Sequence, residues 1–502
     1  MQAILVAWGL INCKWIARNI DVRLCGMTIR SRRYKLSKFF LAGLFSFISF
    51  VSWSAFSATL YFDPVSGSDS GNGSRSNPYG SLESAMNSDL AIVAGDTLKL
   101  LSGFHGYVKL SGFDNETLVS IEGDVSGSTK LASLEINGSN KFRVQNLSIS
   151  PYHDPVYNPV NNKINNILSI SRSADIEILN NNIFTIDDIS GWSAEDWNNR
   201  MSSGISVGSS NNKVIGNIVR NINFGITVGP NAHNVDVLRN QVLNFAGDGL
   251  RGLGDDGLFE YNLIANAFDV NGNHDDGFQS FTNNRNPRIV SRVTLRGNQF
   301  YYDLEHPNRD LISAFQGIGC FDGLFNDWLI ENNLLYINHW HGITLLGANN
   351  TRIINNTLID ADSSDGRLRP WIKIAPLKAS QGGQSGTGNV TRNNIAEMTN
   401  EGTGITEDHN LNPLELNLES VFLDFTNNDF RLKSDSLAIN AGSNNLAPLI
   451  DIRGFNRIGG VDIGAYEFGA TSSNGEPPIM AGPVGTNKQL SLPPILFLLD
   501  DE

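Results

Sequence analysis

Three aspartates and one histidine stand at recurring positions from which acid–base chemistry could be carried out. Asp248 precedes Gly-Leu, Asp276 precedes Gly-Phe with Asp275 directly before it, and His341 precedes Gly-Ile. Carboxyl groups held close together repel each other when both are ionised, which pushes their pKa values apart. A carboxyl that keeps its proton and one that has lost it are the pair that cleaves a glycosidic bond. These four residues are therefore the candidate catalytic group.

The four residues belong to a set of short segments that share one pattern, a first residue followed in most cases by glycine and an aliphatic or aromatic residue. The segments are Ser203–Ser206, Phe224–Thr227, Asp248–Arg251, Asp276–Gln279, Gln316–Gly319, His341–Thr344 and Pro370–Lys373. Because side chains alternate along a strand, the hydrophobic position is expected to point inward and its neighbours outward. The pattern predicts one parallel sheet with strands at 203–207, 225–228, 249–252, 277–280, 317–320, 342–346 and 371–374.

Stacking of these strands would align their outward residues in a column. Its predicted members are Thr227, Arg251, Gln279, Gly319, Thr344 and Lys373. Neighbouring strands lie roughly 4.8 Å apart, so Asp248 and Asp276 are expected on adjacent coils, whereas the Gln316 segment separates Asp276 from His341. The candidate substrate-binding residues on this face are Arg251, Gln279, Lys373, Trp340, Trp371 and His274.

The elements that position this column are the coils of a solenoid. An asparagine beside an aliphatic or aromatic stretch recurs at Asn146, Asn182, Asn217, Asn240, Asn262, Asn298, Asn333, Asn356 and Asn394, at separations of 22–23 or 35–38 residues. The short separation is one coil and the long one is a coil with a loop. Asparagine tolerates the left-handed backbone of a sharp corner, and stacked amides can form a hydrogen-bonded ladder. The repeat predicts an all-β chain forming a single right-handed parallel β-helix, whereas a sandwich or propeller would show hairpin turns.

In order and strand register, these motifs resemble the polygalacturonases, which are inverting glycoside hydrolases built on a β-helix. That family carries Asn-Thr-Asp, Asp-Asp, Gly-His-Gly and Arg-Ile-Lys, and this chain has Gly247-Asp248, Asp275-Asp276, His341-Gly342 and Ile372-Lys373. The resemblance implies that Asp275 is the general acid and that Asp248 with Asp276 activates water. It also implies that His341 orients the acid and Lys373 holds a substrate carboxylate. The chain departs from the family at Trp371, where the family has arginine.

Two other classes of protein use the same fold and stay open. A polysaccharide lyase or uronate epimerase would need a neutralised substrate carboxylate, to which Arg251, Lys373 or a calcium ion could contribute. Asp255, Asp256 and Asp322 are candidate calcium ligands, although aspartates are also common in turns. A hydrolase would require no cofactor, whereas a lyase could require Ca²⁺. The third class is a non-catalytic carbohydrate-binding β-helix or adhesin.

The N-terminus predicts export. Five basic residues between Arg30 and Lys38 precede an apolar run at 39–53, and small residues follow at 55–58. This is the pattern of a signal peptide, with translation starting at Met1 or Met27, and the alternative is a membrane anchor. Removal of residues 1–58 leaves 29 basic and 50 acidic residues, a net charge of −21. That charge argues against nucleic acid or an anionic membrane as a partner. The predicted partner is a polysaccharide, with or without uronic acids, and the predicted location is extracellular or periplasmic.

The expected domains are a signal region (1–58), the β-helix (59–400), a closing segment (401–470) and a flexible Gly/Pro/Ser-rich tail (471–502). Cys320 is the single cysteine after residue 58, so the mature chain cannot form an internal disulfide. Long inserts at 151–163, 187–201, 281–291, 301–315 and 361–369 are predicted to wall a groove over the aspartates, because inserts on one side of a solenoid are typically its binding side.

Overall fold

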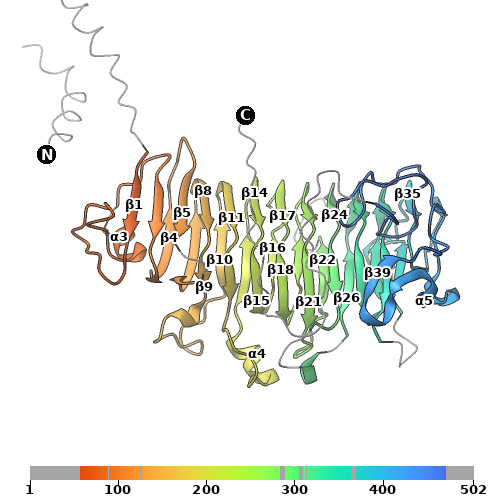
Figure 1. Cartoon of the computed structure of the whole chain (residues 1–502), viewed down its shortest axis with the longest axis horizontal. Coiled ribbons are helices and arrows are strands. Elements are labelled where there is room, and N and C mark those ends of the chain that lie inside the picture. The colour runs from red at the N-terminus through yellow and green to blue at the C-terminus, as the bar shows by residue number, and fades with distance from the viewer. Residues whose placement is uncertain are drawn as a thin grey trace, which may run out of the picture. The chain divides into compact units, whose positions relative to one another are not determined.

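The computed structural model describes residues 57–470, with gaps at 89, 125–126, 283–288, 305–308, 313 and 363–368. The described part forms a right-handed parallel β-helix (Figure 1). The predicted tail and all but the last two residues of the predicted signal region lie outside the described residues. Within the described residues, no helix has the length and hydrophobicity that a membrane crossing requires.

Each coil passes in turn through three parallel sheets, which we number in that order. Among the described residues, sheet 1 has 13 strands: β1 (Thr59–Phe62), β2 (Thr97–Leu100), β5 (Val119–Gly123), β8 (Asn140–Gln145), β11 (Ala174–Leu179), β14 (Asn212–Ile215), β17 (Val235–Leu238), β20 (Leu258–Glu260), β24 (Thr294–Arg296), β28 (Leu329–Glu331), β32 (Arg352–Ile354), β35 (Asn389–Arg392) and β37 (Ile405–Asp408). Sheet 2 has ten in the same region: β3 (Gly103–Phe104), β6 (Thr129–Leu131), β9 (Ser148–Ile149), β12 (Asn182–Phe184), β15 (Ile218–Ile222), β18 (Gln241–Phe245), β21 (Leu263–Ala267), β25 (Gln299–Tyr301), β29 (Leu334–Ile337) and β33 (Thr357–Asp360).

Sheet 3 contains the predicted column and confirms its register. Its strands within the described chain are β4 (Tyr107–Ser111), β7 (Ser133–Asn137), β10 (Asn166–Ser171), β13 (Ser203–Val207), β16 (Ile226–Val228), β19 (Leu250–Gly252), β22 (Asp276–Phe281), β26 (Gln316–Asp322), β30 (His341–Leu346), β34 (Trp371–Ala375) and β36 (Glu397–Met398). Leu250 pairs with Phe278, and both side chains are fully buried. Thr227, Arg251, Gln279, Gly319, Thr344 and Lys373 are successive strand partners.

The asparagine ladder exists, but the sequence pattern assigned two of its positions wrongly. The ladder members are Asn181, Asn217, Asn240, Asn262, Asn298, Asn333, Asn356, Asn394 and Asn410, and each accepts a hydrogen bond at its Oδ1 from the backbone of the preceding coil. Asn181 therefore occupies the place that we expected for Asn182. Leu147 occupies the place that we expected for Asn146, which is instead the left-handed corner residue of its coil (φ 60°). The left-handed backbone belongs to the residue before each ladder member, such as Asn180 (φ 54°) and Asn332 (φ 54°). The left-handed corner and the ladder hydrogen bond thus belong to two adjacent residues of each coil.

The remaining elements cap the coils or connect them. Among the described residues they are the helices α3 (Leu82–Asn87), α4 (Ala194–Arg200) and α5 (Leu418–Val421), the 3₁₀ turns η1 (Pro151–His153), η2 (Arg309–Leu311), η3 (Ala379–Gln381), η4 (Pro413–Glu415) and η5 (Phe425–Asn427), the short parallel strands β23 (Ile289–Ser291), β27 (Leu324–Asn326) and β31 (Ala348–Asn349), and the antiparallel pair β38 (Phe422–Asp424) and β39 (Asp429–Leu432). Helix α3 buries Leu82 and Ala85 against the first coils.

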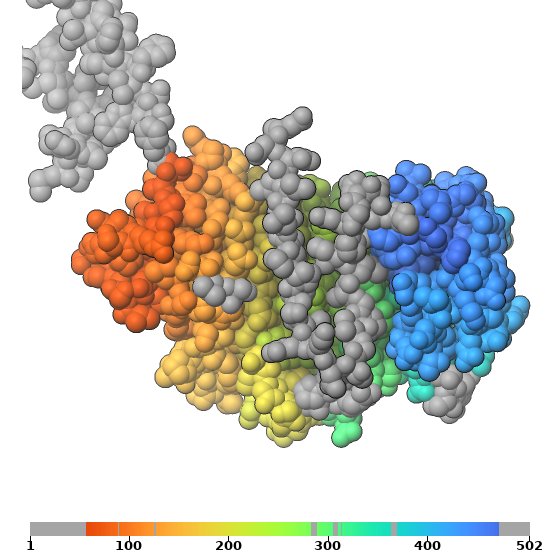
Figure 2. All heavy atoms as spheres, viewed as in Figure 1, coloured from red at the N-terminus to blue at the C-terminus, as the bar shows by residue number. Residues whose placement is uncertain are grey.

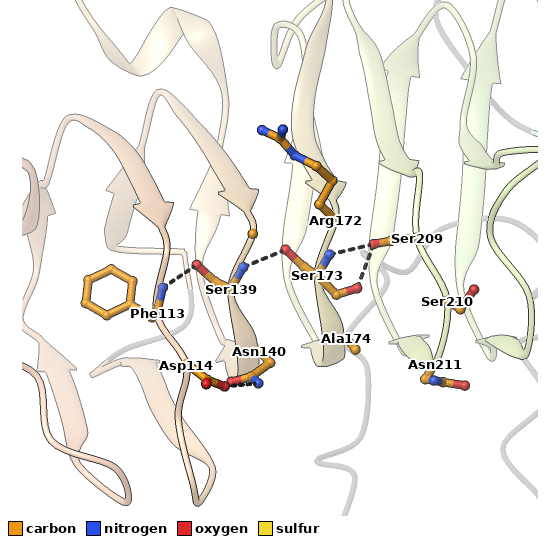
Figure 3. Close-up of a pocket in the computed structure, with 11 residues that line it drawn as sticks. Phe113, Asp114, Ser139, Asn140, Arg172, Ser173, Ala174, Ser209, Ser210 and Asn211 are labelled. Carbon is orange, nitrogen blue, oxygen red and sulfur yellow. Dashed lines mark hydrogen bonds between the residues drawn. The ribbon is translucent and has the colours of Figure 1, made fainter.

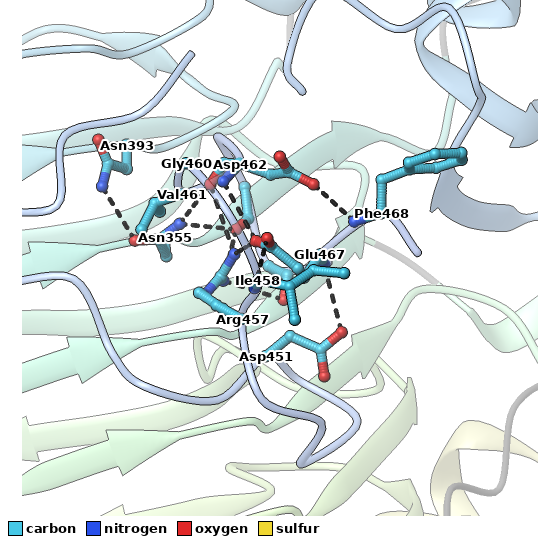
Figure 4. Close-up of polar contacts among 12 residues, drawn as sticks. Asn355, Asn393, Asp451, Arg457, Ile458, Gly460, Val461, Asp462, Glu467 and Phe468 are labelled. Carbon is cyan, nitrogen blue, oxygen red and sulfur yellow. Dashed lines mark hydrogen bonds and ion pairs between the residues drawn. The ribbon is translucent and has the colours of Figure 1, made fainter. Parts of the chain in front are cut away.

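The closing segment starts as part of the solenoid and then folds back along it. Strand β37 pairs with β35 in sheet 1, so regular coils continue to residue 408. Later residues pack Phe422 and Phe430 against sheet 2, and this segment forms the blue surface in Figure 2. Arg457, nearly fully buried, forms an ion pair with Glu467 at 3.0 Å and donates to Asn332 Oδ1 at 2.8 Å (Figure 4). The segment therefore closes the fold by bonding to the corner asparagines of earlier coils.

Four of the five predicted inserts connect sheet 2 to sheet 3 along the chain: 151–163, 187–201, 301–315 and 361–369. The fifth, 281–291, follows β22 at the opposite end of sheet 3. Residues 283–288, 305–308, 313 and 363–368 of these inserts lie outside the described residues. In Figure 1 the orange segment around η1, the yellow helix α4 and the green turn η2 project at the same edge. Most of the long inserts thus occur between sheets 2 and 3, which is also where the candidate aspartates are located.

Candidate functional site

The three aspartates lie where the chain passes from sheet 2 into sheet 3. Asp248 leads into β19, while Asp275 and Asp276 lead into and begin β22. The backbone N–H of Asp276 donates to Asp248 Oδ1 at 3.3 Å, and the backbone N–H of Gly249 donates to the carbonyl oxygen of Asp276 at 2.9 Å. Asp248 and Asp276 are therefore on adjacent coils, as predicted.

An insert anchors the loop that carries Asp275. Trp197 of α4 packs against Phe268, which follows β21, with ring centroids 4.5 Å apart. Both side chains are buried in a small apolar cluster that also contains Ala246, just before Asp248. The local sequence favours this arrangement, since Ser193 and Asp196 form a capping box that starts α4. Packing of the insert thus fixes the chain on the sheet 2 side of the aspartates.

Asp248 is buried but carries a cationic partner. Arg251, from the outward column, forms an ion pair with it, and the guanidinium also lies 3.8 Å from the ring centroid of Phe224. Burial raises the pKa of Asp248 to about 6, although the charge and hydrogen bond of Arg251 oppose that shift. Asp248 is consequently the carboxyl of this group that ionises most readily near neutral pH.

Asp276 is fully buried, and among the described residues only one of its two carboxyl oxygens has a hydrogen-bond partner. Its Oδ2 accepts a hydrogen bond from Gln279 Nε2 at 2.9 Å, while its Oδ1 has no hydrogen-bond partner within the described part of the chain. Burial and the neighbouring Asp248 raise the pKa of Asp276 well above its ordinary value. A Cβ at position 319 would overlap Asp276 Oδ1, so the glycine there makes room for the carboxyl. The sequence analysis did not identify Gly319 as a site residue. Its one signal in the sequence is a glycine in a column whose other members have larger side chains.

Asp275 is also buried and also has a raised pKa. It is 3% exposed, and neither of its carboxyl oxygens has a hydrogen-bond partner among the described residues. Burial, followed by the charges of Asp269, Asp248 and Asp276, raises the pKa of Asp275 to about 9. The side chain is therefore protonated at neutral pH. Gln316, on the next coil, also has a buried Oε1 without a partner in the described chain.

His341 lies two strands from the aspartates and contacts a different set of groups. Strand β26 separates β22 from β30, as predicted. The His341 Nδ1 is 3.1 Å from Thr344 Oγ1, and its ring meets Phe321 edge-on at 4.8 Å. Among the described residues Asp275 has no hydrogen-bond partner, so the orienting contact from His341 that the family resemblance implied is not made. Burial, with smaller contributions from His339, Lys373 and His274, lowers the pKa of His341 to about 4.

The other predicted binding residues divide between these two places. Trp340 and Trp371 stack near His341 with centroids 6.4 Å apart and planes 25° apart. Lys373 forms an ion pair with Glu401 and lies 5.5 Å from the Trp371 ring centroid. His274 is exposed in the loop before Asp275.

The structure does not bring the three candidate calcium ligands together. Asp256 forms two hydrogen bonds with Arg292, at 2.5 and 2.8 Å, and Asp322 accepts from Lys378 at 2.8 Å. Asp255 accepts from the backbone N–H of Ser291, on the next coil, at 3.0 Å. The described ranges of the chain contain no group of three or more His, Cys, Asp or Glu residues arranged to hold a metal ion.

A separate polar hollow of about 340 Å³ lies at the corner between sheets 3 and 1 (Figure 3). Ser139, Ser173 and Ser209 on successive coils each accept a hydrogen bond from the backbone N–H of the coil before, at 3.1–3.2 Å. These hydroxyl groups thus bond one coil to the next at this corner, as the ladder asparagines do at the corner between sheets 1 and 2. The hollow contains none of the residues predicted for the site.

No protein-family model matches this sequence, and no curated protein matches it. Solved structures similar to it include a pectate lyase, at 16% identity over 82% of this chain and 97% of the lyase, with a TM-score of 0.47. An alginate lyase from Paenibacillus sp. str. FPU-7 is 12% identical over 66% of this chain and 96% of its own (TM-score 0.38). A GH136 lacto-N-biosidase from Eubacterium ramulus is 13% identical over 70% and 68% (TM-score 0.41). The strand pairing within this chain itself defines its class, the right-handed parallel β-helix proteins.

Proposed function

We propose that this chain is an exported glycoside hydrolase that cleaves a polysaccharide at the corner between sheets 2 and 3. The observation that supports the proposal is the difference between the pKa values of two neighbouring carboxyl groups. Burial raises the pKa of Asp275 to about 9, while Arg251 helps to hold the pKa of Asp248 at about 6. At neutral pH one group therefore carries a proton and the other is largely ionised, which is the pairing that acid–base glycosidic cleavage needs.

The proposed reaction is a single displacement. Asp275 gives its proton to the glycosidic oxygen as the bond from that oxygen to the anomeric carbon breaks. A water molecule attacks the anomeric carbon from the opposite face and loses a proton to Asp248, with Asp276 beside it. The product has inverted configuration, and both carboxyl groups return to their starting states by proton exchange with solvent. Because the three carboxyl groups are buried, sugar binding must displace side chains that now enclose them.

Two contacts support a hydrolase over a lyase or epimerase. Both alternatives need a group that neutralises the carboxylate of a uronic acid. Arg251 and Lys373, which were the two side-chain candidates for that role beside a calcium ion, already pair with Asp248 and Glu401. A protonated Asp275 supplies what a hydrolase requires without any such group.

The test is incubation of the mature protein with a panel of acidic and neutral polysaccharides, following reducing ends and ultraviolet absorbance together. A hydrolase produces reducing ends without absorbance. A lyase also produces an absorbing double bond, and an epimerase leaves the chain length unchanged. Binding to a polysaccharide without any of these changes would instead identify a carbohydrate-binding protein and overturn the enzyme proposal.

A further inference from the structure

A second cluster of side chains on sheet 3 has contacts that the proposed hydrolysis does not use. His339 and Trp340 precede β30, His341 begins it, and Trp371 begins β34. The His339 ring lies 4.7 Å from that of Trp340 and 5.2 Å from that of His341. Trp340 is 39% exposed, although it also stacks on Trp371. We call these four residues the aromatic cluster.

Thr344 fixes the protonation of the His341 ring through two hydrogen bonds. Trp371 Nε1 and His341 Nδ1 both lie 3.1 Å from Thr344 Oγ1. An indole N–H can only donate, so Thr344 accepts from Trp371. The hydroxyl hydrogen of Thr344, a buried residue, then has His341 Nδ1 as its acceptor. The opposite arrangement, with hydrogen on Nδ1, would leave that buried hydroxyl hydrogen unpaired, which is unfavourable. His341 Nδ1 is therefore the acceptor, and Nε2 carries the hydrogen.

The neighbouring His339 is held in the same state by the backbone. The N–H of His341 donates to His339 Nδ1 at 3.0 Å, so the hydrogen of the neutral His339 ring is also on Nε2. Burial lowers the pKa values of both histidines to about 4, which keeps both rings neutral at pH 7. The aromatic cluster thus combines an exposed indole with two imidazole groups whose Nε2–H is a donor.

We propose that the aromatic cluster is a subsite for a pyranose ring, and that Thr344 is a positioning residue that keeps His341 as an Nε2–H donor. A sugar ring would stack on Trp340, and its hydroxyl or ring oxygens would accept hydrogen bonds from the imidazoles. Two strand spacings, roughly 9.6 Å, separate this cluster from Asp276, so the subsite would hold a ring further along the same glycan. The subsite rests on the proposed function only in taking a polysaccharide as ligand.

The first experiment needs no ligand. Two-bond ¹H–¹⁵N correlation spectra of histidine-labelled protein at pH 7 should show His341 as the Nε2–H tautomer. The Thr344→Val variant should lose that preference, Thr344→Ser should keep it, and Thr227→Val, in the same column, should leave it unchanged. An Nδ1–H tautomer of His341 in the wild-type protein would overturn the role of Thr344, and this result does not depend on any variant folding.

The second experiment tests the subsite by affinity electrophoresis, with native gels that contain pectate, alginate, xylan, glucomannan or galactan. The Asp275→Asn protein should be retarded in at least one gel, and adding Trp340→Ala should remove most of that retardation. Adding Tyr107→Ala, which removes a similarly exposed aromatic ring from β4, should not. The subsite would be overturned if adding Trp340→Ala left the retardation of the Asp275→Asn protein unchanged, or if that protein were retarded in none of the gels. Retardation that depends on Trp340, together with a wild-type protein that cleaves none of the polysaccharides in the panel, would instead refute the proposed function alone.

Discussion

The backbone N–H of Asp276 donates a hydrogen bond to the Oδ1 of Asp248, which lies 28 positions earlier on the adjacent coil. This bond joins the carboxyl group of Asp248 to the backbone of the next coil, while Arg251 pairs with the other oxygen of Asp248. The two aspartates therefore differ in environment despite their equivalent places in the repeat. Asp248 has a cation, whereas Asp276 has only the amide of Gln279. Equivalent positions in a solenoid can thus hold groups with different protonation.

The first prediction concerns the two adjacent aspartates. Asp275→Asn should lower the turnover rate by on the order of 10² to 10⁴-fold, because a general acid typically contributes that much. Asp276→Asn should also lower it, because Asp276 lies beside Asp248, the proposed base. Rates would be measured as reducing ends on the polysaccharide identified in the panel, after thermal melts confirm folding. Asp255→Asn is the control, since Asp255 lies past the end of β19, accepts a hydrogen bond from the backbone of Ser291 on the next coil, and should change turnover little. Near-normal rates in both folded variants would rule out the hydrolase mechanism.

The second prediction is a bell-shaped dependence of the rate on pH. The acid must be protonated, so the rate should fall as pH rises through about 9, the pKa to which burial raises Asp275. The base must be ionised, so the rate should also fall as pH drops through about 6, the raised pKa of Asp248. Initial rates across this range, with folding checked at each pH, would measure both limbs. A rate that keeps rising above pH 9 would contradict the role of Asp275.

The third prediction concerns stability rather than turnover. The pKa of Asp275 is raised to about 9 in the folded protein, against about 3.9 for an unfolded aspartate. The unfolded chain therefore ionises first, and the folded state loses relative stability as pH rises from about 4 to about 9. Asp275→Asn removes this loss, so its melting temperature relative to wild type should increase across that range. Melts at several pH values would show it, and a constant difference would contradict the raised pKa.

The fourth prediction tests the space beside Asp276. Gly319→Ala places a methyl group where Asp276 Oδ1 now lies, so the carboxyl must move. Displacement of a catalytic group can cost on the order of 10²-fold in rate, and we expect a loss of that size with folding retained. Gly191→Ala is the matched control, because a Cβ at this exposed position meets nothing within 4 Å. Equal rates in the two variants would show that the position of Asp276 is not important for turnover.

The fifth prediction concerns the closing segment. Arg457→Ala leaves the buried Glu467 without its cation and removes the bond to Asn332, and should lower the free energy of unfolding by roughly 3–5 kcal/mol. Urea titration would measure the change. Arg431→Ala, which breaks an ion pair at a side chain that is 53% exposed, should cost less than about 1 kcal/mol. A small effect at Arg457 would show that the network is not required to close the fold.

Much of the fold follows from local patterns in the sequence. The glycine–hydrophobic segments predicted sheet 3 and its register, because alternation along a strand depends only on neighbouring residues. Asn217 and its equivalents predicted the ladder for a related reason, since identical residues at one repeat spacing must stack. The same pattern could not distinguish Asn181 from Asn182. Only the corner geometry decides which of two adjacent asparagines lies in the ladder.

The candidate site depended more on tertiary structure. Sequence reasoning grouped Asp248, Asp275 and Asp276 on one edge of the sheet, and strand order alone put His341 two coils away. The pKa values differ because burial and hydrogen bonding differ, and these depend on segments as distant as the insert that packs Trp197 on Phe268. Likewise, Arg457 bonds to Asn332 across 125 positions. The sequence alone determined which side chains share a face, whereas only the folded chain decided which of them are paired, because pairing depends on contacts between residues remote in the chain.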